Sequence, residues 1–391
     1  MREGWTYKTL EECCDVINGL WTGKKEPFIK VAVIRNTNFS KDCRLKLDDV
    51  AYIDVEAKQF ATRKLKVGDI IIEKSGGSEK QPVGRAVLFD IPNGDYSFSN
   101  FTAALRVKDD VNLNPTFLHK CLYGHYVKGA TLKMQSKTTG LHNLDMKAFL
   151  RLPIPSLPIP EQERIVAELD LLTDIIDKQK TQLKELDTLA SSIFYDMFGN
   201  PVDNDKEWET KPMKKVAPVG QYNGKILGKN GKYWLLNLDM VAQQTGEIIE
   251  KRLFSKDEIG NSTITFDETN VLYSKLRPYL NKVAIPDEKG YGTSELIPLK
   301  PDATILERCF LTHLLRSKPF VNYISGKVAG AKMPRVTMGT FWEFPIILPP
   351  LSLQQSFAEK IEAIERQKAN INASIAETQK LFDYTMDKYF G

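Results

Sequence analysis

The sequence predicts an α+β protein made by tandem duplication, in which a mixed α/β globular domain is followed by one long helix in each copy. Two segments of the 391 residues, 161–198 and 352–390, contain neither glycine nor proline, although the chain has 24 glycines and 20 prolines. Because both residue types disfavour a helix interior, these segments permit long uninterrupted helices. Each follows a similar proline-rich stretch, LPIPSLPIPEQE at 152–163 and FPIILPPLSLQQ at 344–355. We expect the two helices to pair as an antiparallel coiled coil.

A shift of 192 residues aligns the landmarks of the two copies. The pairs that it superposes are Phe149 and Phe341, Pro153 and Pro345, Pro158 and Pro350, Gln162 and Gln354, and Gly199 and Gly391. Agreement of separate landmarks on one shift indicates an internal repeat. Outside the helices the copies are less alike. The stretches that still correspond are KVGDIIIEKSGG (66–77) with DETNVLYSKLRP (267–278), and PVGRAVLFD (82–90) with YLNKVAIPD (279–287).

Each globular part is predicted to combine short strands with short helices. Apolar runs bounded by Gly, Asn, Asp or Pro predict strands at 69–72, 85–89, 270–273 and 282–285. Helices are expected around 115–128 and 307–324. The predicted organisation is a first globular domain at 1–151, a proline-rich stretch with the first helix at 152–201, a second globular domain at 202–343, and a proline-rich stretch with the second helix at 344–391.

Apolar residues in both long segments recur at alternating spacings of four and three, which predicts a coiled-coil seam. In the first helix the seam residues are Ile165, Leu169, Leu172, Ile176, Leu183, Leu186, Ala190, Ile193 and Met197. In the second they are Phe357, Ile361, Ile364, Ile371, Ile375, Phe382 and Tyr389. Polar residues occupy the seam at Gln179, Lys368 and Thr378. At 1.5 Å per residue, such a helix is a rod of about 57 Å.

The start and the partner of the second helix can also be predicted. Ser352 and Gln355 have the spacing of a capping box at its first turn. We expect the two helices to pack on each other, because neither can bury its seam alone. The alternatives are that each helix lies flat on its own domain or pairs with another chain.

The net charge of +4 hides an uneven distribution. The two globular parts carry +6 (1–151) and +4 (202–343), whereas the two helical parts carry −5 (152–201) and −1 (344–391). Basic lobes rich in amide and hydroxyl side chains suit a polyanion such as duplex DNA. The alternative is a set of solvated lysines without a partner.

Composition and motifs exclude several classes of protein. The longest apolar stretch, 341–353, contains three prolines and is too short to cross a bilayer. The N-terminal residues lack the apolar core of a secretory signal. The five cysteines show no CxxC spacing, which argues against a disulfide scaffold or a zinc site and fits a reducing cytosol. We therefore expect a cytoplasmic protein without a membrane partner.

The sequence contains no catalytic signature. GLWTGKK at 19–25 lacks the spacing of a phosphate-binding loop, and the four histidines form no metal-binding pattern. Asp69 and Glu73 before Lys74 resemble a nuclease arrangement. The second copy has Asn270 and Ser274 in place of these acids, however, so we expect structural roles for them and no catalytic or metal site.

These residues together resemble the specificity (S) subunit of type I restriction-modification systems. The resemblance extends over the whole chain, and its strongest stretches are VIRNTNFS (33–40), DIIIEKSGGSEKQPVGRAVLF (69–89), TTGLHNLDMKAFLRLPIPSLPIPEQERI (138–165) and NGKYWLLNLDM (230–240). The proline-rich stretch followed by Glu-Gln and a long helix is the most specific feature. The second copy departs from it, with Leu353-Gln354 where the first has Glu161-Gln162.

The resemblance implies a subunit without catalytic activity, in which each globular part is a target-recognition domain for one half of a bipartite double-stranded DNA site. The paired helices would fix the distance between the halves and bind two adenine-N6 methyltransferase subunits. Restriction subunits with translocase and nuclease activity would complete the complex. S-adenosylmethionine, ATP and Mg are then expected on the partner subunits, and no cofactor on this chain.

DNA contacts are expected on basic and amide-bearing turns that occur in both copies. In the first copy the candidates are Arg35, Asn36, Asn38, Lys74, Ser75, Gly76, Gly77, Ser78, Lys80, Arg85, Lys137, Thr138, Thr139, His142 and Asn143. In the second copy they are Lys275, Arg277, Tyr279, Lys282, Lys332, Arg335 and Thr337. Arg and Lys suit guanine edges, and Asn suits adenine. Alternatively, Arg85 and Lys282 only brace the sheet, and the lysines contact phosphates without recognising sequence.

Three other functions fit parts of the sequence. The chain could be a freestanding duplex-DNA-binding or architectural protein, which would act without methyltransferase partners. It could be a DNA-modifying enzyme with unrecognised motifs, in which case the purified chain would cleave or methylate DNA. A coiled-coil scaffold for proteins alone would show no salt-dependent affinity for DNA.

Overall fold

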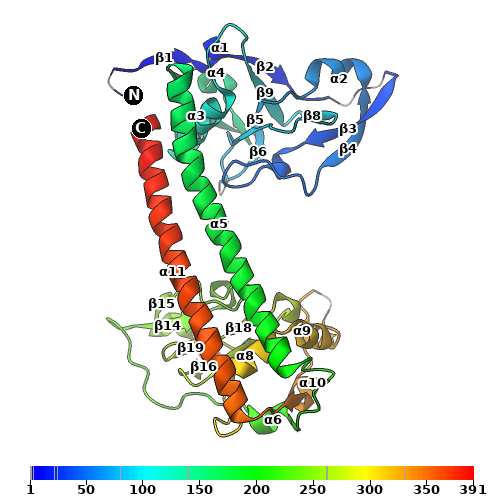
Figure 1. Ribbon diagram of the computed structural model, residues 1–391, viewed down its shortest axis with the longest axis vertical. Helices are drawn as coiled ribbons and strands as arrows, with labels where there is room; N and C mark the ends of the chain where they lie inside the picture. Colours follow the sequence, from blue (N-terminus) through cyan, green and yellow to red (C-terminus); the bar gives the residue numbers. More distant parts are fainter. Residues whose placement is uncertain are drawn as a thin grey trace. The chain divides into compact units, whose positions relative to one another are not determined.

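In the computed structural model, both predicted long helices are present, as α5 (Ile159–Phe198) and α11 (Leu351–Phe390) (Figure 1). The shift of 192 residues relates their first and last residues, which confirms the helical part of the repeat. Because α11 begins at Leu351, Ser352 lies inside its first turn, and the predicted capping box is wrong. The structure describes residue 2, residues 4–21, residue 23, and residues 25–79, 81–138, 141–260, 263–330 and 332–391, with only the backbone at 137 and 138.

The chain divides into two compact units. Unit 1 comprises Met1–Lys178 and Ile375–Gly391, and unit 2 comprises Gln179–Ser374. The division falls within the long helices, so each unit contains one part of α5 and one part of α11. None of the helices in the described part of the chain is long and apolar enough to cross a membrane.

The described part of unit 1 contains four small sheets of short strands, with short helices between them. Its strands are β1 (Thr6–Thr9), β2 (Cys14–Asn18), β3 (Phe28–Ile34), β4 (Ala51–Glu56), β5 (Ile70–Glu73), β6 (Ser75–Gly77), β7 (Ala86–Leu88), β8 (Tyr96–Phe98), β9 (Thr102–Val107), β10 (Gln135–Thr138), β11 (Leu141–Leu144) and β12 (Pro153–Ser156). Its shorter helices are α1 (Leu10–Cys13), η1 (Asn36–Asn38), α2 (Ala57–Arg63), α3 (Pro115–Val127), η2 (Ala130–Met134) and α4 (Met146–Phe149). The sheets have the orders β2-β9-β5-β7, β4-β3-β8, β10-β11-β6 and β1-β12.

Unit 2 follows the same plan. Its strands are β13 (Thr210–Pro212), β14 (Lys232–Leu236), β15 (Leu253–Ser255), β16 (Thr263–Phe266), β17 (Val271–Ser274), β18 (Val283–Ala284), β19 (Gly290–Thr293), β20 (Leu296–Leu299), β21 (Val328–Ala329), β22 (Arg335–Val336) and β23 (Pro345–Ile347). Its shorter helices are α6 (Met213–Val216), η3 (Leu238–Met240), α7 (Lys256–Ile259), η4 (Pro278–Leu280), α8 (Arg308–Arg316), α9 (Lys318–Ser325) and α10 (Met338–Glu343).

Strand pairing confirms that the globular parts are copies of one fold. In unit 1, β5 pairs with β7 and β9, and β3 pairs in parallel with β8. In unit 2, β17 pairs with β18 and β20, and β14 pairs in parallel with β19. A two-stranded sheet before each long helix, β1-β12 or β13-β23, completes the correspondence. The predicted strands therefore occur, and the predicted helix near 307–324 occurs as two, because Ser317 caps α9 and Pro319 lies in its first turn.

The two long helices pair in an antiparallel manner within each unit. In unit 2, Gln179 Nε2 donates to Ser374 Oγ at 2.7 Å, and Lys368 Nζ lies 2.8 Å from Asp187 Oδ1. The partner in α11 thus moves from Ser374 back to Lys368 as α5 runs from Gln179 to Asp187, which is the antiparallel order. In unit 1, the hydroxyl of Tyr389 donates to Glu168 Oε2 at 2.6 Å. The polar seam residues Gln179 and Lys368 therefore each donate a hydrogen bond across the helix pair.

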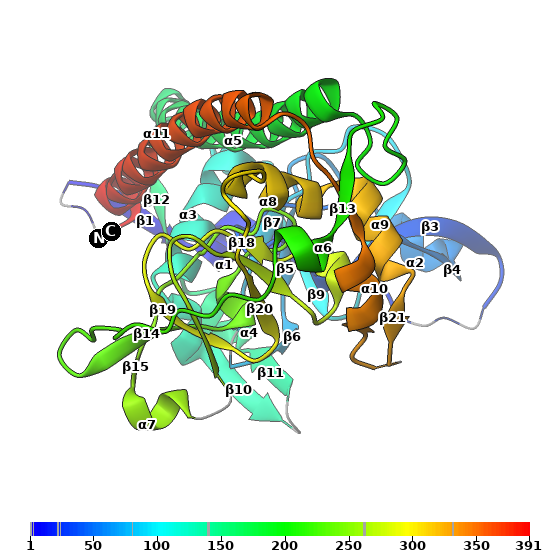
Figure 2. The ribbon, with the colours of Figure 1, turned by 90° about the horizontal axis from the view of Figure 1, so that it is seen from below.

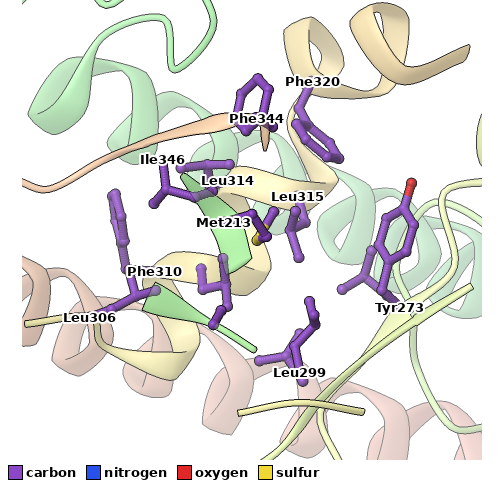
Figure 3. Packing of buried hydrophobic residues seen from close by; sticks show 14 of the residues in the cluster. Met213, Tyr273, Leu299, Leu306, Phe310, Leu314, Leu315, Phe320, Phe344 and Ile346 are labelled. Carbon is purple, nitrogen blue, oxygen red and sulfur yellow. The ribbon is translucent and has the colours of Figure 1, made fainter. Parts of the chain in front are cut away.

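The main core of unit 2 lies where the helix pair meets α8. Figure 3 shows part of this core, in which Met213 and Leu299 pack among side chains of α8 and α9. Phe310 of α8 packs against Phe194 and Phe198 of α5, with ring centroids 5.7 and 4.7 Å apart; Figure 2 shows α8 beside the helix pair. The predicted seam is therefore displaced by one residue at the end of α5. Phe194 and Phe198 are buried there, whereas Ile193 and Met197 are half-buried.

Candidate nucleic-acid interface

The predicted DNA-contact residues of unit 1 fall in three segments, at 35–38, 74–80 and 137–143. The described residues of these segments meet around the short strand β6. β6 pairs with β11, so that Ser75 lies opposite Asn143 and Gly77 opposite His142. The Ser75 hydroxyl lies 2.5 Å from Asn143 Oδ1. On the other side, Asn36 Nδ2 contacts the Ser75 carbonyl at 3.4 Å. Residues distant in sequence therefore form one polar surface.

The η1 turn is the first part of this surface, and its side chains divide into exposed and buried ones. Asn38 is only 2% exposed, and its amide donates to the Asp49 carbonyl and accepts from the Arg35 backbone, both at 2.9 Å. Arg35 is half-buried and lies 3.4 Å from the Asp49 carboxylate. Burial therefore favours a structural role for Asn38 in the turn, whereas the neighbouring amide of Asn36 is half-buried.

Arg85 directly precedes β7 and contacts the η1 turn. It is buried and forms an ion pair with Glu73. Its Nε and Nη2 each lie 2.9 Å from a Glu73 carboxylate oxygen. Its Nη1 donates to the Phe39 carbonyl at 2.7 Å, and its Nη2 to the Asn36 carbonyl at 3.3 Å. Burial lowers the pKa of Arg85, but its hydrogen bonds and the charge of Glu73 outweigh this effect and raise the pKa. The hydrogen bonds of its guanidinium are therefore made inside the protein, which favours a structural role over a DNA contact.

Lys282 is the equivalent of Arg85 in unit 2 and also binds a carbonyl of a 3₁₀ turn. Ser274 N donates to the Lys282 carbonyl just as Glu73 N donates to that of Arg85, so the two cations occupy equivalent strand positions. Lys282 Nζ donates to the carbonyl of Leu238, the first residue of η3. Burial lowers the pKa of Lys282. In both units, a cation directly before a strand therefore holds the 3₁₀ turn, a structural role close to the bracing of the sheet that the sequence left open.

The other parts of the surface in unit 1 are the segment 74–79, called the glycine loop below because it contains Gly76 and Gly77, and the β10–β11 hairpin. Lys74 Nζ donates to Asn18 Oδ1 at 2.8 Å, and burial lowers its pKa. Ser78 is exposed at the end of β6. His142 Nδ1 lies 2.9 Å from Gln135 Oε1. Of the other predicted residues, Lys80 and Thr139 lie outside the described residues, as do the side chains of Lys137 and Thr138.

Unit 2 brings its own predicted loops together. Arg277 adopts a left-handed conformation with φ of +50°, and its N–H donates to the Pro334 carbonyl at 2.7 Å. Val336 N donates to the Lys275 carbonyl at 3.0 Å, which joins this turn to the β21–β22 hairpin. The side chains left exposed by this arrangement are Arg277, Tyr279, Lys332, Arg335 and Thr337.

These exposed cations differ in how far they are neutralised. Arg335 Nη2 lies 2.8 Å from Glu295 Oε1, and this hydrogen bond lowers the pKa of Glu295. The Arg277 guanidinium has no hydrogen-bond or ion-pair partner among the described residues. Arg277 is therefore the more available cation for a phosphate or a base.

In unit 1, the polar surface around β6 also includes Gln81, which was not among the residues predicted from the sequence. Its amide oxygen, when turned toward Arg85, lies 2.6, 3.0 and 2.8 Å from Nη1, Nε and Nη2. Its place between the glycine loop and Arg85 was visible in the sequence, but its contact with a buried guanidinium was not. The described residues contain no group of three or more His, Cys, Asp or Glu that could hold a metal ion.

The fold defines a protein with two related α/β units, each of which carries polar and basic loops and one part of both long helices. The family model described as "Type I restriction modification DNA specificity domain" matches residues 2–188 and 205–379, and the chain belongs to this family. The two matches cover the two copies of the repeat.

Individual relatives are distant. The chain is 22% identical over 279 residues to the type I restriction enzyme EcoDI specificity subunit of Escherichia coli, an alignment that covers 60% of this chain and 61% of that protein. It is 20% identical over 381 residues to the putative type I restriction enzyme MjaX specificity subunit of Methanocaldococcus jannaschii, covering 93% and 87%. The alignment thus spans about three fifths of the length of the first relative.

Two solved structures share the fold. One is the S subunit of a type I restriction-modification system from M. genitalium, with a TM-score of 0.55 and 12% identity, covering 100% of this chain and 98% of that one. The other comes from work on complex assembly and conformational transition of the type I R-M system, with a TM-score of 0.56, 17% identity and the same coverage. At these identities the likeness concerns the fold.

Proposed function

We propose that this chain is the DNA sequence-recognition subunit of a type I restriction-modification complex. The observation that carries the proposal is that the same arrangement occurs twice. In each unit, a cation directly before a strand, Arg85 or Lys282, donates a hydrogen bond to a carbonyl of a 3₁₀ turn that lies close to polar loops. A bipartite DNA target needs two such surfaces, one for each half. The family of the chain supports this assignment.

The globular domains at 1–151 and 202–343 are the proposed target-recognition domains, each for one half-site. α5 and α11 set the distance between the half-sites and bind two adenine methyltransferase subunits, which use S-adenosylmethionine. Restriction subunits that use ATP and Mg join the same complex in the cytoplasm. The chain itself provides specificity and no catalysis.

The chemistry of the two surfaces supports a division between positioning and recognition. Exposed cations such as Arg277 and Lys332 suit the DNA backbone, which dominates affinity and makes it salt-dependent. Amides such as Asn36 suit base edges in the major groove. The buried Arg85 and the half-buried Lys282 contact neither; they hold the turns that carry the recognition groups.

Methylome sequencing of the host with and without this chain tests the proposal. We expect a bipartite adenine-methylated sequence that disappears when the chain is deleted and returns when it is supplied from a plasmid. Purification of the chain should then yield methyltransferase subunits with it. An unchanged methylome, or a chain that methylates or cleaves DNA alone, would overturn the assignment.

A further inference from the structure

A cavity of about 340 Å³ opens in unit 1 between the η1 turn and the glycine loop. Glu73 and Arg85 form its floor, Asn36 and Gln81 provide side-chain amides at its walls, and Gly76 and Gly77 lie at its edge. These groups come from η1, the end of β5, β6 and the segment between β6 and β7.

The floor of the cavity is polar but carries no net charge. The Glu73 carboxylate and the Arg85 guanidinium are joined by two hydrogen bonds of 2.9 Å, and Arg85 also binds backbone carbonyls. A phosphate would therefore find no free cation there. A neutral group with donors and acceptors fits this surface better than an anion.

The glycines keep the cavity open. Gly76 has a φ of +98°, and a Cβ added to it would lie 2.7 Å from Asn36 Nδ2. A Cβ on Gly77 would lie 2.7 Å from a Val83 methyl group. Side chains at these positions would displace the Asn36 amide or close the edge, so the glycines allow a ligand to come close to the backbone.

The two amides are held in ways that suit ligand binding. Asn36 Nδ2 contacts Glu73 Oε1 and the Ser75 carbonyl only at 3.4 Å, which is at the outer limit of a hydrogen bond. These weak contacts can be exchanged for bonds to a ligand. The amide oxygen of Gln81 is held by Arg85, which leaves its NH₂ group as the end away from the guanidinium.

On the basis of the function proposed above, we infer that this cavity is where unit 1 recognises the major-groove edge of an A·T base pair. The Asn36 amide pairs with adenine through its NH₂ donor and its oxygen acceptor, and the NH₂ group of Gln81 adds a further donor. Glu73 and Arg85 are positioning residues, because they hold the Asn36 turn and the Gln81 amide. In unit 2 the equivalent residues are Leu238, Ser274 and Lys282, so the two units recognise their half-sites with different chemistry.

The variants N36A and Q81A test this inference, with N93A as a matched control, since Asn93 is an exposed amide of unit 1 that does not line the cavity. The wild-type methylome first gives the target. The full chain, purified with its methyltransferase subunits, is then titrated against duplexes in which each base pair of either half-site is substituted in turn.

We expect N36A and Q81A to lose about tenfold or more of the discrimination at one A·T position in one half-site. Discrimination in the other half-site, the salt dependence of binding and all properties of N93A should stay as in wild type. The double variant E73S/R85K, which installs the residues of unit 2, should relax the same position. Unfolding curves confirm that each variant is folded.

Two results would overturn the inference. One is unchanged discrimination at every position in N36A and Q81A. The other is uniform weakening of all duplexes with a smaller salt slope, which would indicate phosphate contacts. A wild-type chain without a bipartite methylated target would instead contradict the proposed function, so the two failures can be told apart.

Discussion

Gln162 and Gln354 make the same three hydrogen bonds at the same place in the two units. Gln162 Oε1 accepts from Asn114 N at 2.8 Å, and its Nε2 donates to the carbonyls of Asn112 and Leu157 at 3.0 and 2.8 Å. Gln354 makes the equivalent bonds at 2.8, 3.0 and 2.7 Å. Both side chains are fully buried. Each glutamine thus joins the first turn of a long helix to the loop before α3 or α8.

Replacing either glutamine with alanine should destabilise its own unit. Gln354→Ala leaves a buried N–H and two buried carbonyls without partners, at a cost of roughly 2–4 kcal/mol. Denaturant unfolding followed by probes in each unit would measure this cost. Gln355→Ala is the matched control, because the neighbouring Gln355 is exposed. Equal stability of the two variants would contradict the role of the buried amide.

The Glu73–Arg85 pair should be more sensitive to loss of one partner than to replacement of both. Arg85→Leu leaves the Glu73 carboxylate buried without its cation, which costs about 3–5 kcal/mol. E73S/R85K removes the buried carboxylate and keeps a cation for the turn, so its loss should be clearly smaller. Thermal or urea unfolding compares the two. A double variant that is less stable than Arg85→Leu would show that the pair is not the source of the cost.

Tyr389 should contribute to unit 1 although it lies at the end of α11. Its ring is 2% exposed and packs in the unit 1 core, and its hydroxyl binds Glu168. Tyr389→Ala should cost about 3–5 kcal/mol, as for other buried aromatic residues. Tyr384→Ala, on the exposed part of the same helix, should change stability by less than about 0.5 kcal/mol. Limited proteolysis of unit 1 reports the difference.

The stability of unit 2 should fall in mild acid because of His313. Burial, with the nearby charges of Arg316 and Lys368, lowers the pKa of His313 to about 3 from an ordinary value of 6.5. The unfolded chain therefore binds a proton below pH 6.5 that the folded chain excludes, and stability is lost as the pH falls from 6.5 toward 3.

Substitution of His313 with leucine removes this dependence. The difference in unfolding free energy between wild type and His313→Leu should change by up to about 2 kcal/mol between pH 7 and pH 5, in favour of the variant at pH 5. Urea denaturation at the two pH values measures it. Parallel pH profiles for both proteins would refute the assignment.

Arg277 and Arg335 should differ in their contribution to DNA binding. Arg277→Ala should weaken binding to all duplexes and reduce the salt slope by about one. Arg335→Ala should have a smaller effect, because Glu295 already neutralises that guanidinium. Fluorescence anisotropy titrations at several salt concentrations compare the two. An unchanged slope in Arg277→Ala would exclude this turn as a phosphate contact.

The long helices and the repeat could be predicted from the sequence because their signals are local. Absence of Gly and Pro defines a helix over its own residues, and the shift of 192 residues needs only a comparison of the chain with itself. The break between α8 and α9 had a local signal as well, in Ser317 followed by Pro319.

The contacts that build the site could not be predicted in this way, because they join residues that are far apart in sequence. Asn36 meets Ser75 across 39 positions, and Ser75 meets Asn143 across 68. An exposed basic residue and a buried one look the same in a sequence, so the sequence alone does not decide between a DNA contact and a bracing role for Arg85. The displaced seam at Phe194 likewise depends on α8, which lies more than a hundred residues further along.

The division of the chain has a consequence for the order in which its parts can form during synthesis. Unit 2 is one continuous stretch, Gln179–Ser374, whereas unit 1 needs Ile375–Gly391 as well as the N-terminal residues. The side chains of Phe382, Met386 and Tyr389 that complete its core are therefore translated after the whole of unit 2. Until they are made, the core of unit 1 lacks part of its apolar cover, although most of the unit has already been synthesised.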